Sequence, residues 1–444
     1  MAAANQSPYG DRIFRSGRRS GTVAEIVSAA ATTRLLRERG VRILIVHNRY
    51  QQPGGEDAVV SNESVLLAGH GHDVRMHVVS NDEIKGFGDK VSALRHCAYS
   101  IGSRNSLAER LASEKPDIVH VHNVFPLLTP SVYDACRAHR VPVVQTLHNY
   151  RIMCANGLLM RNGSPCRVCV DGTPYQGALH ACYRGSYVGS AAVAHMIDRH
   201  RREGTWLAKV DRYIALSNFS RAEFVAAGLP KELVSVKGNV VFDPGPVEAR
   251  IRRGGLFVGR LSEEKGVRDL IRAWNGLNVP LTIAGDGPLM SEVRAHASSN
   301  IRVLGRVDKS AINREMRRAA FLILPSTCFE NFPVSVAEAF ASGLPAVVAR
   351  IGALADIVKD HETGLHFEPG DAEALRAAVR WADGHPAQMA EMGRVARATY
   401  ERELCPEVNY RQLKAIYDAA LDGARPIQIE APSCDVLPEV VAFP

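Results

Sequence analysis

Short apolar runs alternate with amphipathic helical stretches along most of the chain. In the first half these runs span residues 41–47, 74–79, 117–122, 141–147 and 211–216. After residues 244–246, which read Pro-Gly-Pro, the alternation starts again with runs at 255–258, 280–284, 301–305, 321–325 and 345–349. Continuous apolar runs separated by helices are typical of parallel strands that are covered on both faces. The pattern therefore predicts an α/β fold with two doubly wound, Rossmann-like domains.

The same pattern predicts five segments. We expect residues 1–39 to form a partly disordered N-terminal extension, because the first 21 residues are polar and lack periodicity. Residues 40–239 are predicted to form the first Rossmann-like domain, with a Cys-rich insertion at 150–188, and residues 240–404 the second. We expect a helix at 405–423 that returns to the first domain, followed by a disordered tail at 424–444.

Glycine and polar residues follow several of the predicted strands. These positions are Gly54 and Gly55, His122 and Asn123, His148 and Asn149, Gly259 and Arg260, and residues 285–288. In an open parallel sheet, ligands bind beyond the carboxyl ends of the strands. We therefore expect the two domains to turn these edges toward each other and to share one site in a cleft.

Two of these strand ends carry features that suit phosphate. Gly54 and Gly55 precede a helix that we expect to begin near Asp57, and the free N–H groups of a helix N-terminus favour anions. The pattern is not the G-x-G-x-x-G of dinucleotide-binding proteins, and a plain tight turn explains the pair equally well. Arg260 and Lys265 flank the start of a later helix and suit a diphosphate, although two solvated surface cations are the alternative.

Two carboxylates follow the apolar run at 321–325. Glu330 lies in the predicted loop, and Glu338 lies just over one turn into a helix that begins after Pro333 and ends near Ser342. Paired carboxylates bind sugar and ribose hydroxyls or act as acid and base. Acids near a helix N-terminus also occur for electrostatic reasons alone.

These residues carry a resemblance to a known family. The segment ENFPVSVAEAFASGLP at 330–345, with FVGRLSEEKG at 257–266 and PGGED at 53–57, resembles the retaining GT-B glycosyltransferases of family 4. The resemblance covers about residues 41–421 and implies a GT-B fold and a nucleotide-sugar donor. It implies that Arg260 and Lys265 bind the donor diphosphate, that Glu330 lies along the donor sugar, and that Glu338 holds the ribose hydroxyls.

The resemblance implies further roles at other positions. His148 would contact the donor sugar near the reacting centre, and the backbone amides of Asn331 and Phe332 would hold the sugar ring. Asn331 stands where many relatives have glycine. Gly54 and Gly55 would approach the diphosphate and the acceptor. The segment that packs on the base would be Gly305, Arg306 and Val307.

The charge of the chain is unevenly distributed. The net charge is +7, but residues 1–239 carry 30 basic and 20 acidic side chains, whereas residues 240–444 carry 24 and 27. The first half is therefore expected to face an anionic partner, such as a membrane surface or an acidic substrate. Nucleic acid is not expected, because no zinc-finger or helix-turn-helix signature occurs.

With no 18-residue apolar run and no secretory signal, we expect a cytoplasmic protein, peripheral on the inner face of the membrane.

Four of the nine cysteines lie close together in the sequence. Cys154, Cys166, Cys169 and Cys182 follow the pattern C-x11-C-x2-C-x12-C. One C-x2-C pair supplies half of a tetrahedral zinc site, and the outer pair would complete it. The alternatives are disulfides, which are rare in the cytoplasm, and independent buried thiols.

The hypothesis that the sequence favours is a retaining glycosyltransferase. It would move a sugar from a UDP- or GDP-linked donor to a glycan or lipid-linked acceptor in cell-surface polysaccharide or glycolipid synthesis. The family resemblance implies catalysis without a metal or other cofactor, and no Asp-x-Asp motif occurs to hold a divalent ion. The alternatives are a non-catalytic nucleotide-sugar sensor, a GT-B epimerase or a phosphorylase.

Overall fold

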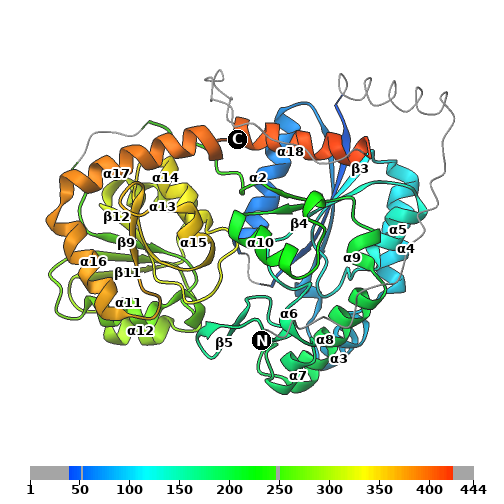
Figure 1. Cartoon of the computed structure of the whole chain (residues 1–444), viewed down its shortest axis with the longest axis horizontal. Helices are drawn as coiled ribbons and strands as arrows, with labels where there is room; N and C mark the ends of the chain where they lie inside the picture. Colours follow the sequence, from blue (N-terminus) through cyan, green and yellow to red (C-terminus); the bar gives the residue numbers. More distant parts are fainter. Residues whose placement is uncertain (1–39, 52–53, 247–250, 424–444) are drawn as a thin grey trace, which may run out of the picture. The chain divides into compact units, whose positions relative to one another are not determined.

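The structure is a computed structural model that describes residues 40–51, 54–246 and 251–423 (Figure 1). The predicted N-terminal extension and C-terminal tail lie outside the described residues. Within the described residues, no helix is both long enough and apolar enough to cross a bilayer.

The first half of the chain forms a six-stranded, fully parallel sheet in the order β2-β1-β3-β4-β7-β8. Its strands are β1 (Arg42–Arg49), β2 (Asp73–Ser80), β3 (Ile118–Asn123), β4 (Val143–Thr146), β7 (Arg212–Ala215) and β8 (Val234–Val236). Every residue of β3, β4 and β7 is buried, as expected for central strands covered on both faces.

Helices connect these strands. They are α2 (Gly55–Gly69), α3 (Phe87–His96), α4 (Ile101–Glu114), α5 (Val132–Ala138), α8 (Tyr187–Arg202), α9 (Thr205–Ala208) and α10 (Asn218–Ala226). Several begin at a serine that caps the first turn: the hydroxyl groups of Ser100, Ser186 and Ser217 accept hydrogen bonds from backbone N–H groups three residues later.

A second six-stranded parallel sheet has the order β11-β10-β9-β12-β13-β14. Its strands are β9 (Gly255–Val258), β10 (Leu281–Ala284), β11 (Ile301–Gly305), β12 (Phe321–Leu324), β13 (Ala346–Ala349) and β14 (Gly364–Phe367). Its helices are α11 (Val267–Trp274), α12 (Met290–His296), α13 (Lys309–Arg318), α14 (Val334–Ala341), α15 (Gly352–Ile357), α16 (Ala372–Gly384) and α17 (Pro386–Thr399). Both sheets follow the strand-helix alternation predicted from the sequence.

The last helix, α18 (Pro406–Leu421), packs against α2, β4 and β7 of the first sheet (Figure 1). The ring of Tyr410 stacks on His70, with centroids 3.6 Å apart. At the other end of the helix, the guanidinium of Arg212 donates to the carbonyl of Ala419 at 3.1 Å. Pro406 occupies the first turn, where a missing N–H costs nothing.

Four strands were not predicted from the sequence. The three-residue β8 and the four-residue β14 are too short for a clear pattern, and β14 includes the half-buried His366. The two-residue strands β5 (Met160–Arg161) and β6 (Ser164–Pro165) form a small hairpin in the Cys-rich segment. Helix α2 begins at Gly55 rather than near Asp57, because the Asp57 carboxylate accepts from the Gly54 N–H at 2.8 Å and so caps an earlier turn.

Candidate functional site

The loop before α2 presents two glycines to solvent. Gly54 has an ordinary φ of −123°, and a Cβ at Gly54 or Gly55 would meet no atom within 4 Å. The fold itself therefore gives no reason for glycine at either position. Their missing side chains leave the N–H groups at the start of α2 accessible, which is the arrangement that a closely approaching anion requires.

Lys265 and Glu330 form an ion pair at the carboxyl end of the second sheet. The Lys265 ammonium lies 2.5 Å from Oε1 of Glu330, and Ser326 Oγ donates to the same oxygen at 2.7 Å. Burial lowers the pKa of Lys265, but the adjacent Glu330 carboxylate outweighs that effect and the pKa is raised. Lys265 is therefore a fixed positive charge at this edge.

Gly266 explains why Lys265 reaches Glu330. It has φ +65°, and a Cβ there would lie 1.8 Å from the Pro325 carbonyl oxygen. Only glycine permits this close approach, which holds the turn before α11 against the end of β12. Arg260, the other predicted diphosphate ligand, is exposed in the loop after β9.

Glu338 on α14 makes an ion pair with Lys309 at the start of α13. The Lys309 side chain is 54% exposed, so it can leave the carboxylate without disturbing the core. Sequence reasoning missed Lys309, although it lies just after the predicted base-binding segment. In that segment the Gly305 carbonyl accepts from the Gly285 N–H at 2.8 Å, Arg306 is exposed and Val307 is half-buried.

Asn331 and Phe332 are buried beside Glu330. Phe332 belongs to the main hydrophobic cluster. Asn331 is 7% exposed, and its buried Oδ1 atom has no hydrogen-bond partner among the described residues. An unsatisfied buried acceptor costs about 1–3 kcal/mol, so this oxygen suits a hydroxyl supplied by a ligand.

His148 follows β4 and meets His122 at the end of β3. His122 Nδ1 and His148 Nε2 are 2.9 Å apart, and the two rings stack with an interplanar angle of 20°. Burial, and then the neighbouring His122, keep the pKa of His148 well below its ordinary value. Both rings line a small pocket together with Asn123, Phe125, Asn149 and Arg151.

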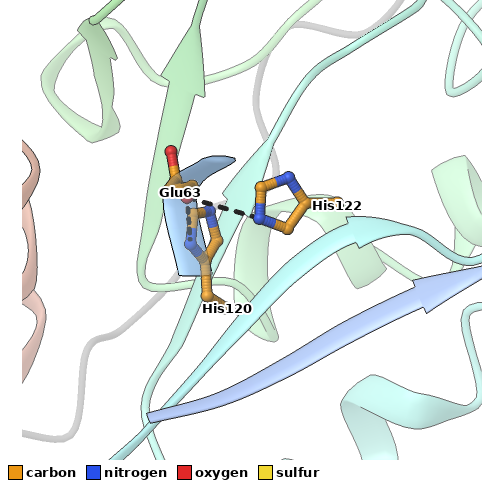
Figure 2. Close-up of side chains that lie close together, drawn as sticks. All are labelled: Glu63, His120 and His122. Carbon is orange, nitrogen blue, oxygen red and sulfur yellow. Dashed lines mark ion pairs between the residues drawn. The ribbon is translucent and has the colours of Figure 1, made fainter. Parts of the chain in front are cut away.

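A buried polar cluster lies behind these rings; we call Glu63, His120, His122 and Lys237 the histidine cluster. Glu63 Oε1 lies 3.0 Å from His120 Nδ1 and 3.4 Å from His122 Nε2 (Figure 2). Lys237 Nζ lies 3.0 Å from Glu63 Oε2. Burial raises the pKa of Glu63, but Lys237 and His120 outweigh burial and hold it well below its ordinary value. The carboxylate is therefore ionised.

The histidine cluster also offers metal ligands. Within the described ranges, Glu63, His120 and His122 are the group of His, Cys, Asp or Glu residues whose ligand atoms all lie within 4.8 Å of one another. Two imidazoles and a carboxylate suit a zinc-like ion. However, the Lys237 ammonium already neutralises the one carboxylate, and a divalent ion placed here would face that buried positive charge at short range. The residues therefore fit an internal ion pair better than a metal centre.

The four clustered cysteines do not form the compact site that their spacing predicts. Cys154 and Cys169 are buried, Cys166 and Cys182 are half-buried, and all four are free thiols. Burial raises the pKa of Cys169 to about 11, and the other three thiols contribute to the rise. The thiols are thus neighbours, but their sulfur atoms do not make up a group within 4.8 Å in the described part of the chain. The zinc-bound spacing of about 4 Å expected from the sequence is absent.

Two family models match consecutive parts of the chain. The model described as Glycosyltransferase Family 4 matches residues 27–241, and the model described as Glycosyl transferases group 1 matches residues 252–382. The first range contains α2 and His148. The second contains both ion pairs, Lys265 with Glu330 and Lys309 with Glu338.

Curated proteins give matches of different lengths. The chain is 27% identical over 441 residues to a glycogen synthase of Mycobacterium tuberculosis, covering 88% of this chain and 98% of that protein. It is 36% identical over 153 residues to the D-rhamnosyltransferase WbpZ of Pseudomonas aeruginosa, covering 33% and 40%. The long match spans both sheets, whereas the shorter match covers about a third of the chain.

Solved structures show the same fold at low sequence identity. The Anabaena protein HepE, solved in complex with UDP and glucose, is 17% identical and has a TM-score of 0.60, covering 85% of this chain and 100% of that chain. The sucrose-phosphate synthase of Thermosynechococcus elongatus is 16% identical and has a TM-score of 0.63, covering 86% and 100%. These likenesses confirm the two-sheet GT-B architecture predicted from the sequence.

Proposed function

Because the chain is a group 1 glycosyltransferase with the GT-B fold, we propose that it transfers a sugar from a nucleotide-sugar donor to a glycan or lipid-linked acceptor with retention of configuration. The observation that carries this proposal is the Lys265–Glu330 ion pair beside the unsatisfied Asn331 oxygen. This arrangement places a cation, an anion and a hydroxyl acceptor at the carboxyl end of one sheet. A nucleoside diphosphate sugar offers a matching group to each of them.

Lys265 and Arg260 are proposed to bind the diphosphate. Glu330 holds the ammonium of Lys265 in place. The guanidinium of Arg260 is exposed and can donate two N–H hydrogen bonds to phosphate oxygens. When the bond between the sugar and the diphosphate breaks, negative charge grows on the departing phosphate. Fixed cations at that point stabilise the transition state more than the ground state, which is what raises kcat.

Glu330 and Asn331 are proposed to hold the donor sugar. Once a diphosphate binds Lys265, the Glu330 carboxylate loses part of its interaction with the ammonium and becomes available to sugar hydroxyls. Its negative charge also favours a sugar ring that becomes positively charged as the bond breaks. The unsatisfied Oδ1 of Asn331 accepts one further hydroxyl, and the backbone amides of Asn331 and Phe332 line the same loop.

Glu338 is proposed to bind the ribose hydroxyls. This carboxylate forms an ion pair with Lys309, so the nucleotide would take the place of an exposed ammonium when it binds. An exposed ion pair contributes only about 0–1 kcal/mol of free energy, so breaking it weakens nucleotide binding only slightly. The neighbouring segment of Gly305, Arg306 and Val307 is proposed to pack on the base. Complexes of HepE and of TarM with UDP favour a uridine donor over a guanosine donor.

The first domain is proposed to contribute Gly54, Gly55 and His148. The accessible N–H groups at the start of α2 suit the diphosphate or an anionic acceptor. The neutral His148 ring suits a hydrogen bond to the sugar near the reacting carbon. Arg260, Lys265 and the α2 N-terminus supply the positive charge that the departing diphosphate needs, so we propose catalysis without a metal ion.

A cytoplasmic location, peripheral on an anionic membrane, is proposed from the surface of the first domain. Helix α3 contains no buried residue, and Phe87, Val91 and Ile101 of α3 and α4 are 82%, 47% and 67% exposed. Lys90 and Arg104 are exposed on the same two helices. Exposed apolar side chains beside cations are typical of a surface that rests on anionic lipid.

The zinc site of the four cysteines stays a prediction. Its support is the mutual proximity of the thiols and the hairpin β5–β6 immediately before Cys166, which is the usual setting of a C-x2-C ligand pair. Closing the site would require the sulfurs to move toward one another. Elemental analysis of the purified full chain tests for bound zinc.

A sensor that binds nucleotide sugars without chemistry is the second candidate, because the donor-binding residues alone would serve it. The decisive experiment incubates the protein with UDP- and GDP-linked sugars and a lipid-linked or glycan acceptor, and measures release of nucleoside diphosphate together with the anomeric configuration of the product. We expect release that depends on the acceptor and product of retained configuration. Binding of a donor without any release would favour the sensor.

A further inference from the structure

A chain of close contacts from Glu63 through His122 to His148 determines where the protons of the two rings lie. Glu63 is ionised, and its Oε1 atom can only accept hydrogen bonds. His122 Nε2 lies 3.4 Å from this oxygen, an electrostatic contact in which neither atom has a hydrogen-bond partner among the described residues. Burial, and then His120, lower the pKa of His122 to about 3, so the ring is neutral and carries one proton. A proton on Nε2 faces the carboxylate favourably, whereas a lone pair there would be repelled.

The state of His122 determines that of His148. With its proton on Nε2, His122 has a lone pair on Nδ1, which lies 2.9 Å from His148 Nε2. That contact requires a donor, so the proton of the neutral His148 ring lies on Nε2. His148 Nδ1 then carries the lone pair. Among the described residues, that nitrogen has no hydrogen-bond partner, and His148 is only half-buried.

We propose that Glu63 and His122 are positioning residues that fix His148 in the Nε2–H form, so that His148 Nδ1 accepts a hydrogen bond from a donor-sugar hydroxyl and cannot donate one. The consequence for the sugar rests on the proposed transferase function, whereas the tautomer does not. His148 therefore orients a hydroxyl and supplies no proton to the departing phosphate.

The other side of the histidine cluster explains why Glu63 can serve as the anchor. Lys237 Nζ donates to Asn409 Oδ1 at 2.9 Å and lies 3.0 Å from Glu63 Oε2, which ties α18, α2 and the segment after β8 together. His120 contacts the same Glu63 oxygen through Nδ1 at 3.0 Å, and this nitrogen also lies 2.8 Å from the Tyr417 hydroxyl, while Nε2 lies 2.8 Å from Thr146 Oγ1. The cluster thus has two branches, and only the His122 branch reaches His148.

The two branches provide a variant and a matched control. Glu63→Gln combined with Lys237→Met removes the ionised carboxylate without leaving a buried ammonium unpaired. Tyr417→Phe disturbs the same buried cluster on the His120 branch. The readout is the protonation of ring nitrogens, measured by long-range ¹H–¹⁵N correlation on full-length protein labelled at histidine. The signals of His148 and His122 are identified by their loss in His148→Gln and His122→Gln.

In the wild-type protein we expect both rings to be neutral with the proton on Nε2. In the double variant we expect the two His148 nitrogen shifts to move toward each other as the tautomers mix, whereas Tyr417→Phe leaves them in place. A His148 proton on Nδ1, a doubly protonated ring, or shifts that the double variant does not move would overturn the proposal. A change of the wild-type signals on treatment with a chelator would also overturn the proposal, because it would show that a metal ion bridges the histidine rings.

Activity then separates this proposal from the proposed function. If the protein is a transferase, kcat/KM of the double variant falls by up to about tenfold, the value of one neutral hydrogen bond, and that of Tyr417→Phe falls less. If no donor is turned over but the His148 tautomer is fixed and depends on Glu63, the positioning role stands and the transferase proposal fails.

Discussion

Oε1 of Glu330 accepts hydrogen bonds from both the Lys265 ammonium, at 2.5 Å, and the Ser326 hydroxyl, at 2.7 Å. The oxygen proposed to contact the donor sugar and the ammonium proposed to bind its diphosphate are thus in direct contact with each other. The Lys265 ammonium and the Glu330 carboxylate therefore hold each other in position. Because both groups are already ordered, less conformational entropy is lost when the substrate binds.

The first prediction concerns Glu330. Glu330→Gln retains the shape of the side chain but removes the negative charge that favours a positively charged sugar ring. We expect kcat to fall by about 10²–10³, as is usual when one preorganised electrostatic group is lost. Steady-state kinetics at saturating acceptor provide the measurement. Glu264→Gln is the matched control, because Glu264 lies in the neighbouring loop with its carboxylate bonded to Ser262. A change in KM alone would show that Glu330 only binds the donor.

The second prediction concerns Glu338 and Lys309. Glu338→Gln should raise the donor KM about tenfold with little change in kcat, because ribose contacts are the same in the ground and transition states. Lys309→Met should act in the opposite direction and lower the donor KM by up to about fivefold, since it removes an exposed competitor for the carboxylate. Lys359→Met, at another exposed lysine of the second half, is the control. A higher KM in Lys309→Met would mean that Lys309 itself binds the nucleotide.

The strands and the last helix could be predicted because their signals are local. The apolar run at 301–305 is β11, and the helix expected at 405–423 is α18, which spans Pro406–Leu421. Local patterning also placed Glu330 in a loop and Glu338 on a helix. The sequence pattern identified both Lys265 and Glu330 as site residues. Nothing in the sequence indicated that these two side chains would form an ion pair with each other.

The histidine cluster could not be predicted from the sequence, for a physical reason. Glu63 and Lys237 are 174 positions apart, and each alone resembles an ordinary surface residue of a helix or a loop. Only the packing of α2 beside β3 and of α18 across both brings them together. The cysteines show the opposite case: their spacing is local and visible in the sequence, but it does not determine the distances between their sulfur atoms, which do not form a group within 4.8 Å in the described residues.

The third prediction separates stability from binding at Gly54. Because φ is −123° and a Cβ would have open space, Gly54→Ala should leave the melting temperature within about a degree of the wild type. The added methyl group should nevertheless obstruct a ligand on the α2 N-terminus and raise the donor or acceptor KM. Gly69→Ala is the control, because Gly69 lies in the same helix and also has open space around it. Unchanged kinetics in Gly54→Ala would remove this loop from the site.

The fourth prediction concerns stability in acid. His122, with a pKa of about 3, and His148, whose pKa is also lowered mainly by burial, stay neutral when folded, whereas unfolded histidines titrate near 6.5. The unfolded state therefore binds more protons below pH 6.5, and the free energy of unfolding should fall as the pH decreases. Each ring contributes up to about 1.4 kcal/mol per pH unit. Urea unfolding at pH 7 and at pH 5 measures the loss.

The matched variants for this effect are His122→Gln and His96→Gln. His122→Gln removes one of the two buried rings and should reduce the loss of stability between pH 7 and pH 5. His96 is exposed on α3, so its replacement should leave the pH dependence unchanged. Equal pH dependence in the wild type and in His122→Gln would contradict the assignment of His122 as a neutral buried ring.

The last prediction concerns the membrane surface of α3 and α4. Phe87 is 82% exposed and Ile101 is 67% exposed, next to the cations Lys90 and Arg104. Inserting apolar side chains at the lipid boundary contributes roughly 25 cal/mol for each Å² buried, and each nearby cation adds about 1 kcal/mol on an anionic surface. Phe87→Ser with Ile101→Ser should therefore reduce flotation with vesicles that contain anionic lipid. Ile251→Ser, at an 86% exposed position in the second half of the chain, should not reduce flotation.

Because the cations act through charge, flotation of the wild type should also weaken as the salt concentration is raised. Equal flotation with neutral and anionic vesicles, or no effect of the double variant, would show that these helices do not meet the membrane.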